Sequence, residues 1–314
     1  MYLKNFDWVL FASVLLLACA GLIEIYSIAL GKDASDLANF KKQMIFIGAG
    51  VIIVFVIAFW DYRFLRDFGN YLYVAGILAL VAVLLFGETV KGTTGWFDLG
   101  YFNIQPVEFV KIILIVFLAK LFSSPKTGRK NIFHLLWSFG FVLILFVLVA
   151  LQPDFGSAML LFGVWLVMVV VTGFNKKYLL LIGVVGVLAF TGMWNFYFQD
   201  YQKERILTFL NPSHSSLDQG YNVSQAIIAV GSGGMMGRGV GFGSQSQLKF
   251  LPEVQTDFIF AVIGEELGFV GAFLLILFFG VFFYRCLANL KNIKNDFGIF
   301  LILGAMGLIF IQLF

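Results

Sequence analysis

Long apolar runs separated by short polar segments dominate this chain. A helix needs about 20 residues to cross the hydrocarbon core of a membrane, and nine runs are long enough to do so. The apolar runs cover residues 8–30, 44–60, 71–87, 106–122, 132–151, 157–173, 178–198, 257–284 and 297–314. The pattern predicts an all-α fold, a polytopic bundle of membrane-spanning helices.

Composition strengthens this prediction and excludes several classes of protein. Hydrophobic residues make up 61% of the chain and charged residues 12%, whereas soluble domains carry about 25% charge. A soluble enzyme and a nucleic-acid-binding protein are therefore excluded. The two cysteines, Cys19 and Cys286, cannot form a disulfide framework, and His134 and His214 are too far apart in sequence to indicate a zinc site.

The basic residues predict an orientation in the membrane. Counted over the ends and short loops, twelve Lys and Arg residues lie on the side of the N-terminus and four on the other side. Because basic residues favour the cytoplasmic side, the N-terminus is predicted to be cytoplasmic. Residues 1–314 then form a single polytopic membrane domain, with a large extracellular loop at about 199–256 between the seventh and eighth spans.

The two ends of the chain each raise a question. The sequence Leu16-Leu17-Ala18-Cys19 has a weak likeness to a lipoprotein cleavage site. Eight further spans follow, so an uncleaved first span is the favoured interpretation. The last apolar run continues to Phe314 without a polar exit, and we expect the chain to be a fragment or to end unusually.

The predicted external loop contains the first candidate site. Val223, Ile227 and Ile228 have helical spacing, which indicates a short helix on the membrane surface. Residues 231–243 then contain seven glycines in thirteen positions. This segment is either a flexible hinge or a cradle whose backbone N–H groups bind an anionic group. Arg238 within it favours the cradle.

Acidic residues mark the start and the interior of the eighth span. Thr256 is predicted to cap its helix and Asp257 to lie in the first turn, where the helix dipole stabilises a carboxylate. Asp257 could serve as a general base or a cation ligand, or could act in capping alone. Deeper in the same span lie Glu265 and Glu266. The Gly264–Gly268 spacing predicts close helix contact.

Charged residues in other spans are also candidates, because ionisable groups inside a membrane are commonly functional. Glu24 lies in the first span, and Glu108 and Lys111 lie in the fourth at a spacing that lets them pair. The alternative is that such charges form internal salt bridges that position helices.

A short sequence echo marks two predicted helix starts. Gln105-Pro106-Val107-Glu108 and Gln152-Pro153-Asp154 both precede apolar runs. Proline suits the first position of a helix, and an acid in the first turn suits the helix dipole.

Several of these segments resemble the SEDS family (shape, elongation, division and sporulation; the RodA/FtsW/SpoVE proteins), which are membrane enzymes that polymerise peptidoglycan. The resemblance runs along the whole chain. It is most specific in residues 243–253, in Thr256-Asp257-Phe258-Ile259-Phe260 and in Glu265-Glu266-Leu267-Gly268, and it is closer to the elongation (RodA) branch than to the division (FtsW) branch. It implies ten spans, of which the tenth is absent here.

The resemblance also implies an activity and a set of site residues. The implied substrate is lipid II, which would be polymerised at the outer face of the bacterial cytoplasmic membrane. Asp257 matches the essential acid, and the residues at positions of family motifs or in the external loop are Trp96, Glu108, Lys111, Asp154, Arg238, Lys249 and Glu253. Carboxylates could hold a divalent cation, Mg²⁺ or Mn²⁺. The chain departs from the family pattern at Gly95, Val107 and Asn222.

The partners implied are membrane lipid and a class B penicillin-binding protein, a transpeptidase. Two other functions remain open. A flippase or transporter for the lipid-linked precursor would use the buried charges, although transporters usually place such residues at the membrane midplane. A scaffold for a partner enzyme would need only the apolar bundle.

Overall fold

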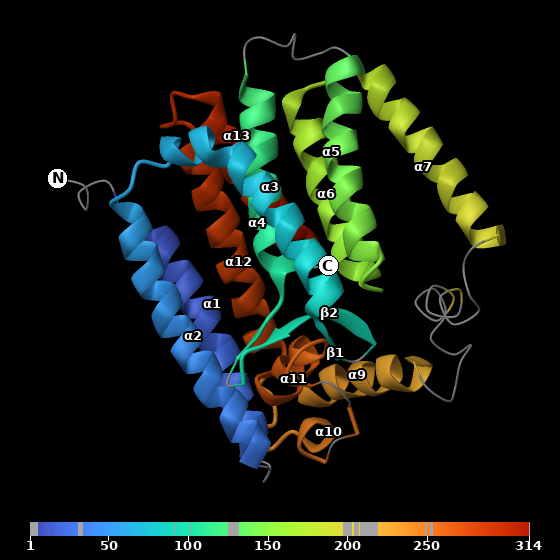
Figure 1. The fold of residues 1–314 in the computed structure, drawn as a ribbon. Coiled ribbons are helices and arrows are strands. Elements are labelled where there is room, and N and C mark those ends of the chain that lie inside the picture. Colours follow the sequence, from blue (N-terminus) through green and yellow to red (C-terminus); the bar gives the residue numbers. More distant parts are fainter. Residues whose placement is uncertain are drawn as a thin grey trace. The chain divides into compact units, whose positions relative to one another are not determined.

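The computed structural model describes most of the chain, namely residues 6–30, 34–90, 92–100, 102–124, 132–196, 203, 207, 219–248, 250–251 and 254–313. The helices of this part are α1 (Trp8–Ala29), α2 (Ala34–Ala58), α3 (Arg63–Phe86), α4 (Pro106–Ser123), α5 (Ile132–Ala150), α6 (Phe155–Thr172), α7 (Lys176–Phe196), α9 (Gln219–Gly233), α10 (Ser244–Gln247), α11 (Ile259–Glu266), α12 (Gly268–Leu290) and α13 (Asp296–Leu313) (Figure 1).

The prediction of a polytopic helical membrane protein is confirmed. Seven helices in the described part of the chain are long and apolar enough to cross a membrane, and these are α1, α2, α3, α5, α6, α12 and α13. The two remaining predicted spans coincide with α4 and α7. Helix α2 begins ten residues before its predicted span, because Lys41 and Lys42 continue the helix beyond the apolar run.

A small antiparallel sheet precedes α4 and was not predicted. Its strands are β1 (Glu88–Val90), β2 (Thr93–Asp98) and β3 (Asn103–Ile104), in the order β1-β2-β3. Trp96 pairs with Glu88 on one side, and Phe97 pairs with Ile104 on the other. The short strands lie between longer apolar runs, so hydropathy gives little signal for them.

The chain divides into two compact units, which are described separately. Unit 1 comprises residues 1–60 and 187–285, and unit 2 comprises residues 61–186 and 286–314. The prediction of one polytopic domain with an extracellular loop at 199–256 stays a prediction.

Helix α4 is the centre of unit 2. It packs against α3, α6 and α13, and its side chains Val110, Leu114 and Leu118 are almost fully buried. Glycine allows the last of these helices to approach closely, because a Cβ at Gly304 of α13 would lie 2.7 Å from Ile115 Cγ2. Small residues at such contacts are typical of packing between helices in membranes.

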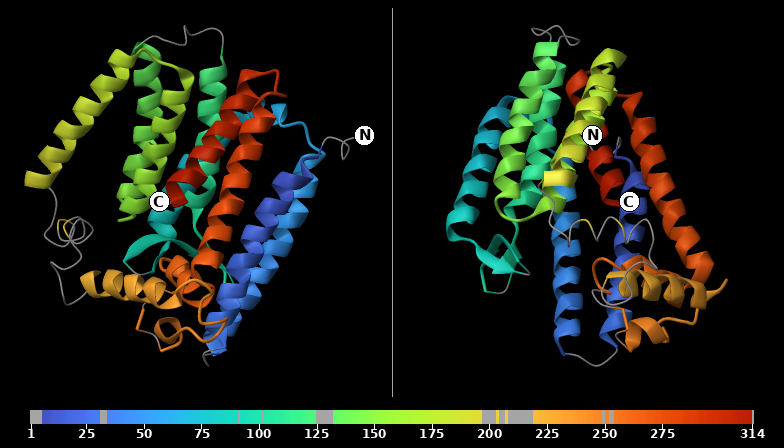
Figure 2. Two further views of the ribbon diagram at one scale, coloured as in Figure 1. Left: turned by 180° about the vertical axis from the view of Figure 1, so that it is seen from behind. Right: turned by 90° about the vertical axis from the view of Figure 1, so that its right-hand side faces the viewer.

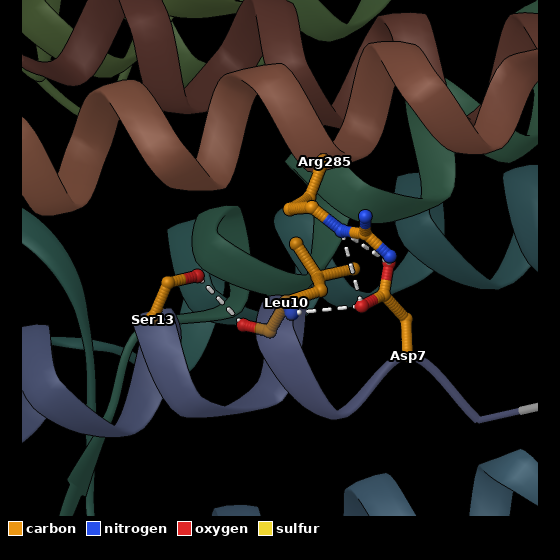
Figure 3. A network of polar contacts seen from close by, with 4 residues as sticks. All are labelled: Asp7, Leu10, Ser13 and Arg285. Carbon is orange, nitrogen blue, oxygen red and sulfur yellow. Dashed lines mark hydrogen bonds and ion pairs between the residues drawn. The ribbon is translucent and has the colours of Figure 1, made fainter.

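In unit 1, α1 and α2 pack side by side as a hairpin (Figure 2). An ion pair joins the start of α1 to the end of α12, since Arg285 Nη2 lies 2.9 Å from Asp7 Oδ2. Asp7 also caps α1, where its carboxylate accepts the backbone N–H of Leu10 at 3.0 Å (Figure 3). One carboxylate therefore both starts α1 and binds it to α12.

Helix α9 confirms the helix expected around Val223, Ile227 and Ile228, and its axis is steeply inclined to the axes of α1 and α2 (Figures 1 and 2). It packs against α11. The contact is close at Gly264, where a Cβ would lie 3.0 Å from Val230 Cγ2. The predicted helix contact at Gly264 is thus confirmed.

The prediction of one continuous span over 257–284 is wrong. Helix α11 ends at Glu266, α12 begins at Gly268, and Gly268 has a left-handed φ of +67°. The glycine-rich loop lies against this break: the N–H groups of Phe269 and Val270 donate to the carbonyls of Gly234 and Met235 at 2.9 and 3.2 Å. The loop therefore accepts backbone bonds that an unbroken helix would have made internally.

Gly268→Ala should destabilise the protein. The left-handed conformation costs an alanine about 1–2 kcal/mol, and its Cβ would lie 2.3 Å from the Gly237 nitrogen. The thermal midpoint of the detergent-purified variant should fall. Gly280→Ala in α12, where a Cβ meets nothing within 4 Å, is the matched control and should not lower it; equal midpoints for both variants would contradict this account of the break.

Candidate functional site

Two buried carboxylates organise the glycine-rich loop of unit 1. Glu265, at the end of α11, is fully buried. It accepts the backbone N–H groups of Gln245 and Ser246 at 2.9 and 3.1 Å and the hydroxyl of Ser244 at 3.3 Å. These donors belong to the first turn of α10, so Glu265 binds the positive end of that short helix.

Its neighbour Glu266 is also fully buried and contacts both α10 and the loop, with Oε1 accepting the Ser246 hydroxyl at 3.4 Å. Its carboxylate accepts the backbone N–H of Gly241 at 3.0 Å and a short hydrogen bond from the Ser27 hydroxyl of α1. The Ser27 oxygen in turn accepts the Gly241 N–H at 2.8 Å. Gly241 has a φ of +81°, a conformation that side-chain-bearing residues rarely adopt.

These contacts answer the question raised by the glycine-rich segment. It is a cradle for an anionic group, but that group belongs to the chain itself. The N–H of Gly241 bonds to the Glu266 carboxylate, and the N–H groups of Arg238 and Gly239 bond to the carbonyls of Glu265 and Glu266 at 3.0 and 2.9 Å. These three N–H groups are therefore engaged within the chain, and binding of another anion by the rest of the segment stays a prediction.

Arg238 presents its guanidinium on the surface of this loop. The side chain is exposed. Nη1 donates to the Ser244 hydroxyl at 2.7 Å and Nε to the Ser232 carbonyl at 3.4 Å. All of these acceptors are neutral, so the positive charge of Arg238 is available to an anion.

Glu24 of α1 is a buried acid of a different kind. It is fully buried, and neither of its carboxyl oxygens has a hydrogen-bond partner among the residues that the structure describes. It lies one helical turn before Ser27, on the same buried face of α1. Ionised carboxylates are costly in such surroundings, so Glu24 does not contribute the stabilising contacts that Glu265 and Glu266 make.

Asp257 was predicted to lie in the first turn of its helix. In the structure it precedes α11 instead. Residues 254–258 form turns, Phe258 is the N-cap residue, and the helix begins at Ile259. Asp257 is exposed. The helix begins two residues later than the apolar run suggests, which leaves this carboxylate on a turn and open to solvent.

In unit 2 the structure brings together the two halves of the sequence echo. Gln105 is the N-cap residue of α4, and its side-chain nitrogen donates to Asp154 Oδ2 at 3.0 Å. Asp154 caps α6 through the Ser157 N–H at 3.0 Å. Pro106 occupies the first turn of α4 as predicted, whereas Pro153 precedes the cap of α6 and so lies outside the helix.

Strand β2 lies against this pair. The Thr94 N–H donates to the Gln152 carbonyl at 3.3 Å. A Cβ at the buried Gly95 would lie 3.5 and 3.6 Å from the side-chain ends of Gln152 and Gln105. The next residue is the half-buried Trp96. Sequence reasoning missed the two glutamines as site residues, although their repeated Gln-Pro context was a usable signal.

The predicted pair of Glu108 and Lys111 is present on α4, with Lys111 Nζ 2.8 Å from Glu108 Oε1. The two side chains differ in exposure: 2% for Lys111 and 53% for Glu108. Lys111 is thus the buried member that holds the carboxylate, and Glu108 is the member that a ligand can reach.

The remaining predicted site residues are placed as follows. Lys249 and Glu253 lie outside the described residues. Asp257 and Arg238 belong to unit 1, and Trp96, Glu108, Lys111 and Asp154 belong to unit 2. Within the described ranges, no three His, Cys, Asp or Glu side chains gather as metal ligands would, so the divalent cation stays a prediction.

Glu266→Gln and Glu24→Gln should change stability in opposite directions. The first replacement sets an amide against the donors of Ser27 and Gly241, and a buried donor that loses its acceptor costs about 1–3 kcal/mol. The second removes the charge of a buried carboxyl that has no hydrogen-bond partner among the described residues, and an ionised group costs more to bury than a neutral amide. Thermal denaturation in detergent should give a lower midpoint for Glu266→Gln and a higher one for Glu24→Gln; a fall for both would show that Glu24 has a stabilising partner.

Known proteins match this chain over almost its whole length. A family model described as cell cycle protein, for the FtsW, RodA and SpoVE proteins, matches residues 7–314. Stage V sporulation protein E of Bacillus subtilis is 36% identical, over 98% of this chain and 85% of its own. Peptidoglycan glycosyltransferase MrdB of Escherichia coli is 34% identical, over 96% and 81%.

A solved structure shares the fold as well. A chain of a peptidoglycan synthase complex, described as coordinating polymerization and crosslinking, has a TM-score of 0.78 and 26% identity, over 98% of this chain and 85% of that chain. The family model and the relatives cover nearly the whole chain. The chain therefore belongs to the FtsW/RodA/SpoVE family of cell cycle proteins.

Proposed function

We propose that this protein is a peptidoglycan glycosyltransferase that polymerises lipid II at the outer face of the bacterial cytoplasmic membrane. The relative named peptidoglycan glycosyltransferase MrdB supports the reaction class. The observation that carries the proposal is the position of Asp257. Glu24, Glu265 and Glu266 of the same unit are fully buried, whereas Asp257 is exposed on a turn.

The chemistry requires one accessible base. Lipid II carries its sugar α-linked to pyrophosphate, and the glycan product has a β-1,4 bond, so the anomeric centre is inverted. A single displacement achieves this inversion without a covalent enzyme intermediate. The acceptor 4-hydroxyl attacks the anomeric carbon, its proton passes to Asp257, and the pyrophosphate leaves with the bonding electron pair.

Asp257 suits the role of base for two physical reasons. Its carboxylate makes no hydrogen bond or ion pair with any residue in the described part of the chain, so its lone pairs are open to a hydroxyl. The turn that holds it is attached to α11, whose other end carries Glu265 and Glu266. The contacts of these two acids fix α11 and thereby the position of the base.

The leaving pyrophosphate needs positive charge. The exposed guanidinium of Arg238 can supply it, since its hydrogen-bond partners among the described residues are a hydroxyl and a carbonyl. Lys249 is a second candidate from the same loop. The N–H groups of Arg238, Gly239 and Gly241 do not take this role, because they already bond to Glu265 and Glu266.

The unit 2 residues are assigned to substrate binding. Glu108 presents an exposed carboxylate that forms an ion pair with the buried Lys111. This carboxylate can accept hydrogen bonds from sugar hydroxyls. The half-buried Trp96 offers an aromatic face for a sugar ring. Asp154 is already committed to capping α6 and to Gln105, so its contribution is to position the helix starts, while Glu253 joins the substrate contacts from the external loop.

The biological context of the reaction is also proposed. The residue motifs favour cell elongation, with a class B penicillin-binding protein as the partner, in keeping with the solved complex that couples polymerization to crosslinking. Carboxylates such as Asp257 and Glu108 are the ligand type for Mg²⁺ or Mn²⁺. No step of the mechanism above depends on that cation.

Asp257→Asn should abolish polymerisation without unfolding the protein. Loss of a general base lowers rates by about 10²–10⁴-fold, and the exposed side chain makes no contact whose loss would destabilise the fold. The intact protein, with its partner where needed, is supplied with purified lipid II, and glycan length is measured on gels. Asp67→Asn, an exposed acid of α3, is the control and should remain active.

A transport assay separates the alternative function. Labelled lipid II in vesicles would be moved across the membrane by a flippase without glycan being formed. Normal glycan synthesis by Asp257→Asn would contradict the proposed base. If the wild-type protein transported labelled lipid II but formed no glycan, the result would favour the flippase.

Glu108→Ala should lower both stability and activity. It leaves the buried Lys111 ammonium without its carboxylate, and an unsatisfied buried donor costs about 1–3 kcal/mol or more when charged. Thermal denaturation should show that the additional change Lys111→Met restores part of the lost stability, whereas activity stays low. Phe109→Ala, at an exposed neighbouring position of α4, is the matched control; equal destabilisation by it would contradict the pairing.

A further inference from the structure

A pocket with both polar and apolar walls lies in unit 2, where α3 begins and α4 ends. Its volume is about 500 Å³, within the range of small-ligand pockets. The lining combines two basic side chains, Arg66 and Lys120, with the polar residues Asn70 and Ser124 and an aromatic floor. None of these residues takes part in the proposed reaction.

The aromatic floor is firmly built. Tyr73 and Phe117 stack with ring centroids 4.4 Å apart, and Phe141 meets Phe117 edge-on at 4.9 Å. The Tyr73 hydroxyl donates to the Phe141 carbonyl at 2.8 Å, so its polar atom is satisfied and the floor is apolar. Such a surface suits hydrocarbon.

The two basic side chains at the rim of the pocket are not neutralised by a carboxylate in the described part of the chain. Arg66 is exposed and makes no ion pair or hydrogen bond with any residue in the described ranges. Within the described part of the chain, the ammonium of Lys120 donates only to the carbonyl of Asp67, at 3.4 Å. Lys120 can lie along α3 because residue 69 is glycine, where a Cβ would come within 3.1 Å of Lys120 Cδ.

The nearby Arg63 differs from Arg66 because it forms an ion pair. Its Nε lies 3.2 Å from Asp61 Oδ1, and its backbone N–H donates to the same oxygen at 2.9 Å. The backbone N–H of Arg63 makes the largest contribution to holding the pKa of the Asp61 carboxyl below its ordinary value, and the Arg63 guanidinium lowers it further. Arg63 is thus neutralised by an ionised partner and does not line the pocket, whereas Arg66 does.

We propose that this pocket binds an anionic glycerophospholipid, with the phosphate between Arg66 and Lys120, the Asn70 amide donating to it, and an acyl chain on the floor of Tyr73, Phe117 and Phe141. Basic pockets between membrane helices bind anionic headgroups in this manner. The apolar floor beside the charged rim favours a lipid over a free phosphate ion, and the distribution of basic residues predicts the cytoplasmic leaflet as the source.

The test compares lipids that differ in charge alone. The intact protein is exchanged from detergent into phosphatidylcholine nanodiscs that contain phosphatidylglycerol with the same acyl chains, and native mass spectrometry measures the phosphatidylglycerol retained. With about 1 kcal/mol contributed by each basic residue near a headgroup, Arg66→Gln and Lys120→Gln should each reduce retention about fivefold and together about 25-fold. Arg63→Gln is the matched control and should retain the lipid as the wild type does.

A charge-conserving variant guards against misfolding. Arg66→Lys should retain most of the lipid, and the thermal midpoint of each glutamine variant in detergent should match the wild type. Retention of phosphatidylcholine equal to that of phosphatidylglycerol, unchanged retention in the double variant, or full displacement by soluble glycerol phosphate would overturn the proposal. The last result would instead indicate a site for free phosphate esters.

Discussion

The pairing of buried carboxylates with backbone N–H groups is the constraint on which unit 1 depends. A helix break inside an apolar segment exposes polar backbone groups where no water can satisfy them. Glu265 and Glu266 lie directly before the break at Gly268 and bind the loop that covers it. The same contacts attach α10, the loop and α1 to α11. One pair of acids therefore holds four segments in fixed positions relative to one another.

Unit 2 solves a related problem with a different device. Its central helix α4 carries three charged residues, and the buried Lys111 among them is neutralised by a carboxylate three residues earlier. At its other end, Lys120 lies in the last turn, where the helix dipole favours a cation. The two ends of α4 therefore differ in charge and in purpose: a carboxylate faces the proposed sugar site and a cation the proposed lipid site.

The fold was largely predictable because its signals are local. Hydropathy located every long helix, and the three-residue spacing of Glu108 and Lys111 predicted their pairing. The break at Gly268 was not predictable from hydropathy, since Leu267 and Gly268 continue an apolar run and the conformation depends on contacts with the distant loop. The role of Glu266 was hidden for the same reason: its partner Ser27 lies 239 residues away in sequence, and local patterns carry no such information.

The division of labour among the acids follows from their exposure. A catalytic base must meet its substrate, and an acid that satisfies buried N–H groups cannot, because withdrawing it would leave those donors unpaired. Glu265 and Glu266 therefore support the loop, and Glu24, which has no hydrogen-bond partner within the described ranges, lowers the stability of the fold. Asp257 escapes both conditions because α11 begins two residues after it. The unexpected start of that helix, more than the motif itself, makes the carboxylate accessible, and the same helix transmits to it the rigidity of the two buried acids.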